Sequence, residues 1–143
     1  MAAERTARVT WSGSLLEGGG RIEEVGSGAF GPLDVTWASR TEESGGRTSP
    51  EELIAAAHAA CFSMAFSSGL AKAGSPPERL DVSARVTFVP GEGITQSALT
   101  VRATVPGIDE AAFVELAEAA KEACPVSKAL AGGPEITLDA SLA

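Results

Sequence analysis

The sequence predicts an α+β fold with a mainly antiparallel sheet. Segments in which apolar and polar residues alternate, as they do in strands with one buried face, occur on both sides of a long apolar segment. That segment and a second one further on carry apolar residues at helical spacing. A chain of 143 residues is the size of one ordinary domain, so we expect a single domain over residues 1–143.

The N-terminal part is expected to form short strands separated by glycine-rich turns. The strands that we predict are Ala7–Ser12, Arg21–Val25 and Leu33–Ala38. A polar loop, Arg40–Thr48, follows them and carries Arg40 and Arg47.

A strong helix start comes next, at Ser49-Pro50-Glu51-Glu52. Serine at the N-cap, proline at the first helical position and Glu52 at the third are typical of a capping box. The helix is expected to continue to about Ala73, because Gly74 can end it. Its middle is small or apolar on nearly every face, which predicts burial inside the domain or between subunits. Interruption by His58 and several serines argues against a membrane span.

The C-terminal part is expected to begin with a hairpin. Alternation over Leu80–Phe88 predicts one strand, Pro90–Gly93 a turn, and the run ending at Val105 a second strand. Asp109 is a plausible N-cap for a second helix, whose apolar face ends at Cys124. Pro125 bends that helix, and a short turn and a last strand follow; the strand carries Ile136, Leu138, Ala140 and Leu142 on one face.

Composition excludes several classes of function. The net charge of −8 argues against binding nucleic acid, which depends on Lys and Arg neutralising phosphates, and disfavours an anionic membrane surface. The N-terminal residues do not form a basic region followed by an apolar one, so we expect no secretory signal and a cytoplasmic location. In that compartment two cysteines are more often reduced or catalytic than structural.

The residues alone leave the roles of Cys61 and Cys124 open. Cysteine is often a small buried hydrophobe, and a structural disulfide or a reactive thiol is also consistent with the spacing. His58 lies three residues before Cys61, and a Cys/His pair could indicate acyl transfer. We favour a histidine hydrogen-bonded to a neighbouring segment, because no third orienting group is evident. One histidine and two distant cysteines are poor zinc ligands.

Several motifs carry a resemblance to a known family. They are the segment Thr48–Ala65 (TSPEELIAAAHAACFSMA), Val105–Asp109 (VPGID) and Ala123–Ser127 (ACPVS), together with Trp11 and Ile136–Leu138. In this order and spacing they resemble the OsmC/Ohr family, on its OsmC side. The resemblance covers nearly the whole chain. It implies an intertwined homodimer with mainly antiparallel sheets wrapped around long central helices, in which each active site uses both subunits.

The resemblance also implies a thiol-dependent reductase of organic hydroperoxides. Cys61 matches the family's peroxidatic cysteine and Cys124 its resolving cysteine. Arg40 best matches the catalytic arginine and Glu51 the carboxylate that orients it. Two other arginines compete with Arg40 for this role, Arg47 and Arg21.

The chemistry explains why such residues are needed. Only a thiolate attacks the peroxide, and burial in an apolar helix disfavours the anion. A guanidinium stabilises both the thiolate and the departing alkoxide. Glu51 lies ten residues before Cys61, about 15 Å along the axis, so within one helix the two cannot touch. Its expected role is to hold the arginine.

The expected cycle needs no metal, flavin or haem. Attack leaves Cys61 as a sulfenic acid, Cys124 condenses with it to a disulfide, and an external dithiol, lipoyl-type or thioredoxin-like, reduces that disulfide. Apolar neighbours such as Phe62, Met64 and Phe66 favour alkyl or lipid hydroperoxides. The main alternative is a non-enzymatic domain that binds a hydrophobic ligand and carries inert cysteines.

Overall fold

The computed structural model describes residues 1–143 and divides into two units by its internal contacts, Met1–Pro50 and Glu51–Ala143. Both combine a sheet with helix, so the expectation of an α+β fold with mainly antiparallel sheets is confirmed. The expectation that the whole chain is one domain stays a prediction.

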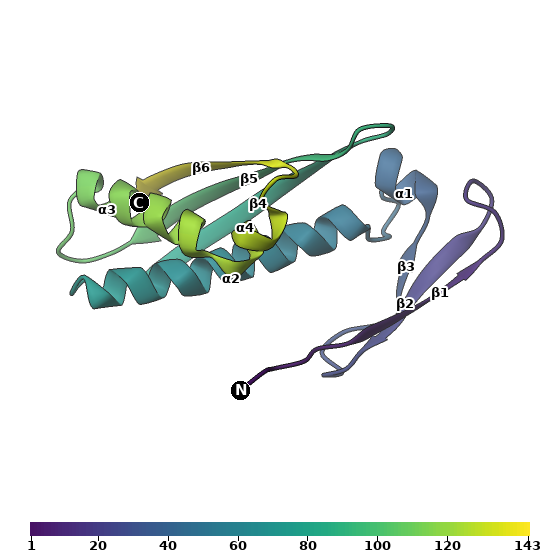
Figure 1. Ribbon diagram of the computed structural model, residues 1–143, viewed down its shortest axis with the longest axis horizontal. Coiled ribbons are helices and arrows are strands. Elements are labelled where there is room, and N and C mark those ends of the chain that lie inside the picture. Colours follow the sequence, from purple (N-terminus) through teal and green to yellow (C-terminus); the bar gives the residue numbers. More distant parts are fainter. The chain divides into compact units, whose positions relative to one another are not determined.

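The first unit contains a three-stranded antiparallel sheet, in the order β1 (Ala7–Ser12), β2 (Gly19–Val25) and β3 (Leu33–Val35) (Figure 1). Trp11 pairs with Gly20 across β1 and β2. A Cβ atom at Gly20 would come within 2.6 Å of the Trp11 ring, so glycine is required for the indole to lie over this strand.

The expected strand Leu33–Ala38 is wrong in its second half. The strand ends at Val35, and the short helix α1 (Trp37–Thr41) begins at once. Thr36 is its N-cap: the Thr36 hydroxyl accepts the Ser39 N–H at 3.0 Å, and the Ser39 hydroxyl accepts the Thr36 N–H at 2.9 Å. These reciprocal bonds stabilise a helical turn where propensity favoured a strand. Arg40 therefore lies on a helix and not in a loop.

The second unit contains the longer sheet, in the order β4 (Arg79–Val89), β5 (Gly93–Thr104) and β6 (Glu135–Leu142). The strands β4 and β5 form the expected antiparallel hairpin. β6 pairs with β5 in the parallel direction, from Gln96 opposite Glu135 to Ala103 opposite Leu142.

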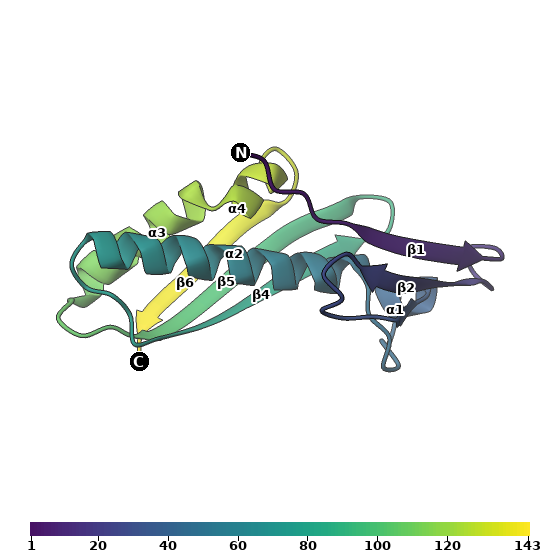
Figure 2. The same ribbon diagram turned by 90° about the horizontal axis from the view of Figure 1, so that it is seen from below.

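Helices cover one face of this sheet. They are α2 (Pro50–Lys72), α3 (Glu110–Ala123) and α4 (Pro125–Leu130), and the two ribbon views show them on the same side of the strands (Figures 1 and 2). The core between the layers contains three aromatic rings. The Phe66 ring lies 5.5 Å from Phe62 and 5.1 Å from Phe113 between centroids, against buried Leu99 and Val101 of β5.

The ends of the two long helices follow from local chemistry. Gly74 adopts a φ of 85°, and the Ser75 N–H donates to the Leu70 carbonyl at 2.9 Å, which is the pattern of a Schellman cap. At the start of α3, the Asp109 carboxylate accepts the Ala112 N–H at 2.8 Å. Both predicted boundaries, at Gly74 and Asp109, are confirmed; the capping box at Ser49 stays a prediction.

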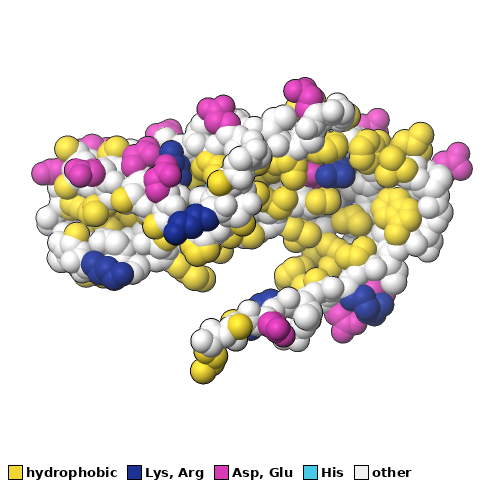
Figure 3. Space-filling model, viewed as in Figure 1, with side chains coloured by type: hydrophobic (Ala, Val, Ile, Leu, Met, Phe, Trp, Pro, Cys, Tyr) yellow, Lys and Arg dark blue, Asp and Glu magenta, His cyan; other side chains and the backbone are white.

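The helix α2 is only partly buried within the single chain. Apart from Glu51 at its start, only one stripe of the helix is buried, formed by His58, Phe62, Phe66 and Leu70, whereas Met64 is 73% exposed. Within the single chain, burial is therefore confined to this stripe, and burial of the other faces between subunits stays a prediction. By length and composition α2 could also cross a membrane, a criterion that core helices share. Figure 3 shows hydrophobic side chains at the surface of both units.

Candidate active site

The two cysteines of the chain meet in the second unit. Cys61 lies near the middle of α2 and is half-buried, whereas Cys124 is fully buried where α3 ends and α4 begins. Pro125 has no N–H and occupies the first position of α4, so the chain must break helix at this point. That break places the Cys124 sulfur against α2, and both thiols are free.

Burial raises the pKa of the Cys61 thiol. The Cys124 sulfur beside it raises this pKa further, and the backbone N–H of Val126 opposes the rise. Within the second unit Cys61 is therefore the thiol that keeps its proton, as expected for a cysteine in an apolar helix.

Cys124 behaves in the opposite way. Burial alone would raise its pKa, but four polar contacts outweigh burial and hold the pKa of Cys124 below its ordinary value. They are the Ser127 N–H, the Cys61 thiol, the Ser127 hydroxyl and the Val126 N–H. The Cys124 side chain makes no capping hydrogen bond to α4.

The pair is thus asymmetric in both access and charge. Cys61 is the thiol that an incoming molecule can reach, and Cys124 is the enclosed thiol that ionises first. Two reduced sulfurs in contact can close a disulfide once one of them is oxidised. Cys61 needs a further positive group to attack as a thiolate at neutral pH.

His58 is fully buried and bridges distant segments. Its Nδ1 atom lies 2.6 Å from the Ser97 hydroxyl of β5, and its Nε2 atom lies 2.8 Å from the Ser127 hydroxyl of α4. Burial lowers the pKa of His58, so the ring is neutral. The prediction of a histidine hydrogen-bonded to neighbouring segments is confirmed.

Sequence reasoning gave no role to Ser97 or Ser127. A signal for Ser97 was present, because it stands on the inward face of β5, two residues before Leu99, and a polar residue at a core position needs a partner. Ser127 follows Cys124 by three residues, at the third position of a helix begun by proline. No pattern in the sequence pairs either serine with His58.

Arg40 and Glu51 belong to different units. In the first unit, the Arg40 guanidinium carbon lies 5.9 Å from the centre of the Trp37 ring on the same short helix. In the second unit, Glu51 is the second residue of α2 and only 6% exposed. Because Glu51 and Cys61 share one continuous helix, the expected separation of about 15 Å along the axis holds. The roles of both residues stay predictions.

The two competing arginines line one open depression of about 390 Å³ in the first unit. Arg21 is paired there with Asp34 of β3, with Nε 3.2 Å from the carboxylate oxygen. Arg47 follows a turn in which its N–H donates to the Ser44 carbonyl at 3.0 Å. The choice among Arg40, Arg47 and Arg21 stays a prediction.

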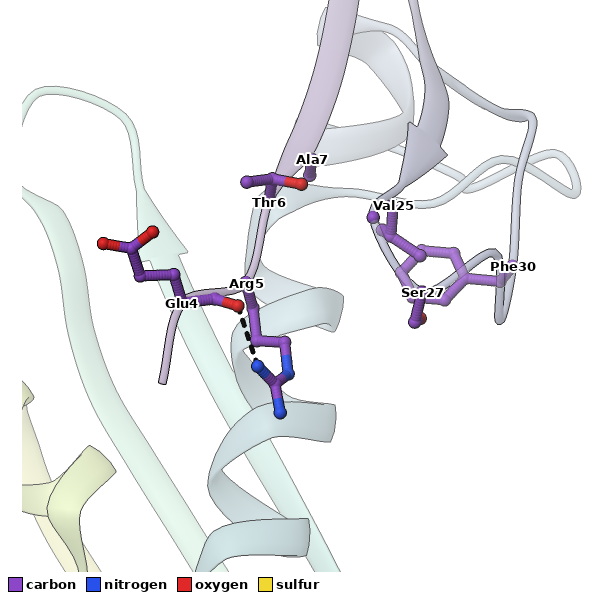
Figure 4. Close-up of a pocket in the computed structure, with 8 residues that line it drawn as sticks. Glu4, Arg5, Thr6, Ala7, Val25, Ser27 and Phe30 are labelled. Atoms are coloured by element: carbon purple, nitrogen blue, oxygen red, sulfur yellow. Dashed lines mark hydrogen bonds between the residues drawn. The ribbon is translucent and has the colours of Figure 1, made fainter. Parts of the chain in front are cut away.

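A second depression of the first unit has a volume of about 790 Å³ and contains no thiol. Residues Glu4–Ala7 form one side, and Val25, Ser27 and Phe30 form the other (Figure 4). The Arg5 guanidinium donates to the Glu4 carbonyl at 2.8 Å within it. Neither titratable group is held by a buried partner, so nothing here competes with the cysteine pair. No cluster of three or more His, Cys, Asp or Glu residues could hold a metal ion.

Comparison with known proteins gives a consistent result. The family model described as OsmC-like protein matches residues 43–139. The chain is 40% identical over 145 residues to "Peroxiredoxin OsmC" of Escherichia coli strain K12, covering 99% of both chains. It is 34% identical over 100 residues to "Organic hydroperoxide resistance protein" of Xanthomonas axonopodis pv. citri, covering 66% of this chain and 67% of that one.

Solved structures agree with these relatives. The crystal structure of the organic hydroperoxide resistance protein OhrB of Bacillus subtilis matches with a TM-score of 0.71 at 27% identity, covering 95% of this chain and 98% of that one. An organic hydroperoxide resistance protein OsmC from Legionella pneumophila matches with a TM-score of 0.68 at 27% identity, covering 95% and 96%. The predicted resemblance is therefore confirmed, and the chain belongs to the OsmC-like protein family.

Proposed function

We propose that this chain reduces organic hydroperoxides to alcohols, with Cys61 as the attacking thiol and Cys124 as the resolving thiol. Its relatives identify it as a peroxidase, an antioxidant oxidoreductase of the stress response. The observation that supports the mechanism best is the contact between the two free thiols brought together by α2 and the junction of α3 with α4.

The proposed reaction has two chemical steps. The Cys61 thiolate attacks the terminal oxygen of the hydroperoxide, the O–O bond breaks, and the alkoxide takes up a proton to become the alcohol. Cys61 is then a sulfenic acid. The Cys124 thiolate attacks the Cys61 sulfur, a disulfide forms, and hydroxide leaves and is protonated to water. A dithiol, lipoyl-type or thioredoxin-like, restores both thiols by exchange and is itself oxidised to a disulfide.

A guanidinium completes the first step. Burial and the Cys124 sulfur both raise the pKa of Cys61, so attack at neutral pH requires a cation that stabilises the thiolate and the departing alkoxide. We assign this role to Arg40 and give Glu51 the role of holding that arginine in place. A bare carboxylate beside Cys61 would raise the pKa of the thiol still further.

A homodimer fits the surface of the chain. Apolar side chains are exposed in both units, among them Val9, Trp11, Leu15, Leu16, Phe30 and Met64. Large apolar side chains that a single chain leaves exposed support burial against a second copy. We therefore propose an intertwined dimer of the OsmC type and a cytoplasmic location. Sedimentation velocity should give a dimer, and a monomer at micromolar concentration would contradict this assembly.

The observed contacts of His58 argue against acyl transfer by Cys61 and His58. Both ring nitrogens are engaged by serine hydroxyls, so neither is directed at the Cys61 sulfur. A general base must lie within hydrogen-bond reach of the proton that it removes.

One experiment tests the proposal directly. After treatment with one equivalent of cumene hydroperoxide, both free thiols should disappear, and mass spectrometry should show an intramolecular Cys61–Cys124 disulfide. If both thiols remain titratable, the proposal fails and the alternative of a ligand-binding domain with inert cysteines stands. Cys61→Ser is the matched control, in which Cys124 should stay reduced under the same treatment.

A further inference from the structure

A buried chain of hydroxyl and imidazole groups crosses the second unit and ends at Cys124. It begins at Ser97 of β5, passes through His58 of α2, and reaches Ser127 of α4, with contacts of 2.6 Å and 2.8 Å. Ser127 is the third residue of the helix whose N-cap is Cys124, so its hydroxyl lies within one turn of the Cys124 sulfur, and it is among the groups that lower the pKa of Cys124. Ser97, His58 and Cys124 are fully buried and Ser127 is 6% exposed. The proposed reaction gives no role to Ser97, His58 or Ser127.

A neutral imidazole has one donor and one acceptor nitrogen, so the chain has two possible directions. With the proton on Nε2, His58 donates to Ser127, and the Ser127 hydroxyl proton is left to donate to the Cys124 sulfur. Ser97 then donates to Nδ1. With the proton on Nδ1, Ser127 donates to His58 instead and can only accept from a Cys124 thiol.

We propose that the Ser97–His58–Ser127 chain keeps the Ser127 hydroxyl pointed as a donor at Cys124, and so holds Cys124 as the thiolate that attacks the oxidised Cys61. Ser127 and His58 are thus positioning residues for the resolving step. This inference rests on the proposed function, since the step occurs only if Cys61 becomes a sulfenic acid. The hydrogen-bonded residues Ser97, His58 and Ser127 gain and lose no proton overall. The Cys124 thiolate displaces hydroxide from Cys61, and solvent supplies the proton that makes water.

The surroundings of Cys124 offer few other groups for this task. On α2, the titratable groups that face it are Cys61 directly and His58 through Ser127. On α3 and α4, Glu122 and Lys128 are exposed, and Lys121 pairs with Glu118 at 3.1 Å. From β5, the Ser97 hydroxyl contacts His58. The lowered pKa of Cys124 is consistent with a donor at Ser127.

The direct test compares two steps in Ser127→Ala. The first is formation of the Cys61 sulfenic acid, followed by dimedone trapping; the second is closure of the disulfide, followed by rapid quenching over a range of pH. We expect the pH midpoint of disulfide closure to move upward, with closure about tenfold slower near neutral pH for each unit of the shift. Sulfenic acid formation should not become slower, because less negative charge on Cys124 can only favour the Cys61 thiolate.

Matched variants separate this role from general packing. Ser127→Thr keeps the hydroxyl and should restore the wild-type pH midpoint. Ser63→Ala removes a hydroxyl on α2 that donates only to its own helix, to the Ala59 carbonyl at 2.7 Å, and should change neither step. Ser97→Ala should move the midpoint in the same direction as Ser127→Ala by a smaller amount.

A second measurement uses the wild-type protein and does not depend on a variant folding. Two-bond ¹H–¹⁵N spectra of the reduced protein, recorded above the pH midpoint of disulfide closure, should show His58 with its proton on Nε2. A proton on Nδ1 under these conditions would overturn the proposal, as would an unchanged pH midpoint in Ser127→Ala. If the wild type forms neither sulfenic acid nor disulfide, the proposed function fails. If the wild type closes the disulfide normally and Ser127→Ala does not shift the pH midpoint, only the proposed role of Ser97, His58 and Ser127 is refuted.

Discussion

The Nδ1 atom of His58 lies 2.6 Å from the Oγ atom of Ser97, which ties the central helix α2 to the middle strand β5. The ring is fully buried, and burial lowers its pKa from the value of 6.5 that it has in an unfolded chain. A charged imidazole here would lose its water and one acceptor nitrogen, so the folded state favours the neutral ring.

This burial predicts that acid weakens the fold. Below about pH 6.5 the unfolded chain binds a proton at His58 that the folded chain does not, so the free energy of unfolding falls as the pH drops through this value. The loss continues until the lower pKa of the folded state is reached. Urea unfolding at several values between about pH 8 and about pH 5 measures the slope.

His58→Gln is the control, because glutamine can bond to hydroxyl groups and does not titrate. The variant should be less stable at neutral pH. Its free energy of unfolding should no longer fall as the pH drops through the range in which His58 titrates. An identical slope in both proteins would show that other groups cause the acid sensitivity.

Replacing Cys124 with serine should leave the first step intact and stop the cycle. Cys61 is the half-buried thiol that a hydroperoxide reaches, and Cys124 is the enclosed one that follows. We expect a single turnover, after which Cys61 is trapped as the sulfenic acid or oxidised further. Intact-mass analysis after a small excess of cumene hydroperoxide detects the added oxygen. Continued multiple turnover in Cys124→Ser would remove Cys124 as the resolving residue.

Removing the guanidinium of Arg40 should slow oxidation of Cys61 on the order of 100-fold, the usual cost of losing one donor to a developing oxyanion. The reason is the raised pKa of Cys61, which leaves little thiolate at neutral pH without a cation. The rate of sulfenic acid formation in a single turnover, measured against pH, gives both the rate and the apparent pKa of the thiol.

Arg21→Ala and Arg47→Ala are the matched comparisons for that measurement. Arg21 is held by Asp34 at 3.2 Å, so its loss should weaken the first sheet and leave the rate of Cys61 oxidation nearly unchanged. If Arg47→Ala lowers the rate and Arg40→Ala does not, the assignment passes to Arg47.

The parts of the fold that the sequence predicted correctly are those set by local chemistry. Alternation along β4 and β5 is visible residue by residue, and the ends of α2 and α3 follow from Gly74 and Asp109. The helix α1 was missed because two reciprocal bonds between Thr36 and Ser39 decide its backbone against the strand propensity of the surrounding residues. Threonine and serine make similar local bonds in turns, so the sequence pattern alone does not distinguish a capped helix from a turn.

The rest depended on contacts between distant residues. The parallel pairing of β6 with β5 and the bonds of His58 to Ser97 and Ser127 join residues 39 and more positions apart. The apolar character of α2 predicted burial but not what covers each face, and a single chain covers only one stripe. Both cysteines were found from motif resemblance, whereas the opposite shifts of their pKa values come from surroundings that only the folded chain assembles.

The aromatic core predicts the largest effect on stability. Phe113 of α3 is fully buried and its ring lies 5.1 Å from Phe66 of α2, so it joins the two helices. Phe113→Ala should lower the free energy of unfolding by about 3 to 5 kcal/mol, because the cavity left behind cannot collapse against a sheet. Glu115→Ala, on the exposed side of the same helix, should change it by less than about 0.5 kcal/mol. Urea unfolding of both variants measures the difference. Equal effects at the two positions would show that α3 does not anchor α2 through this ring.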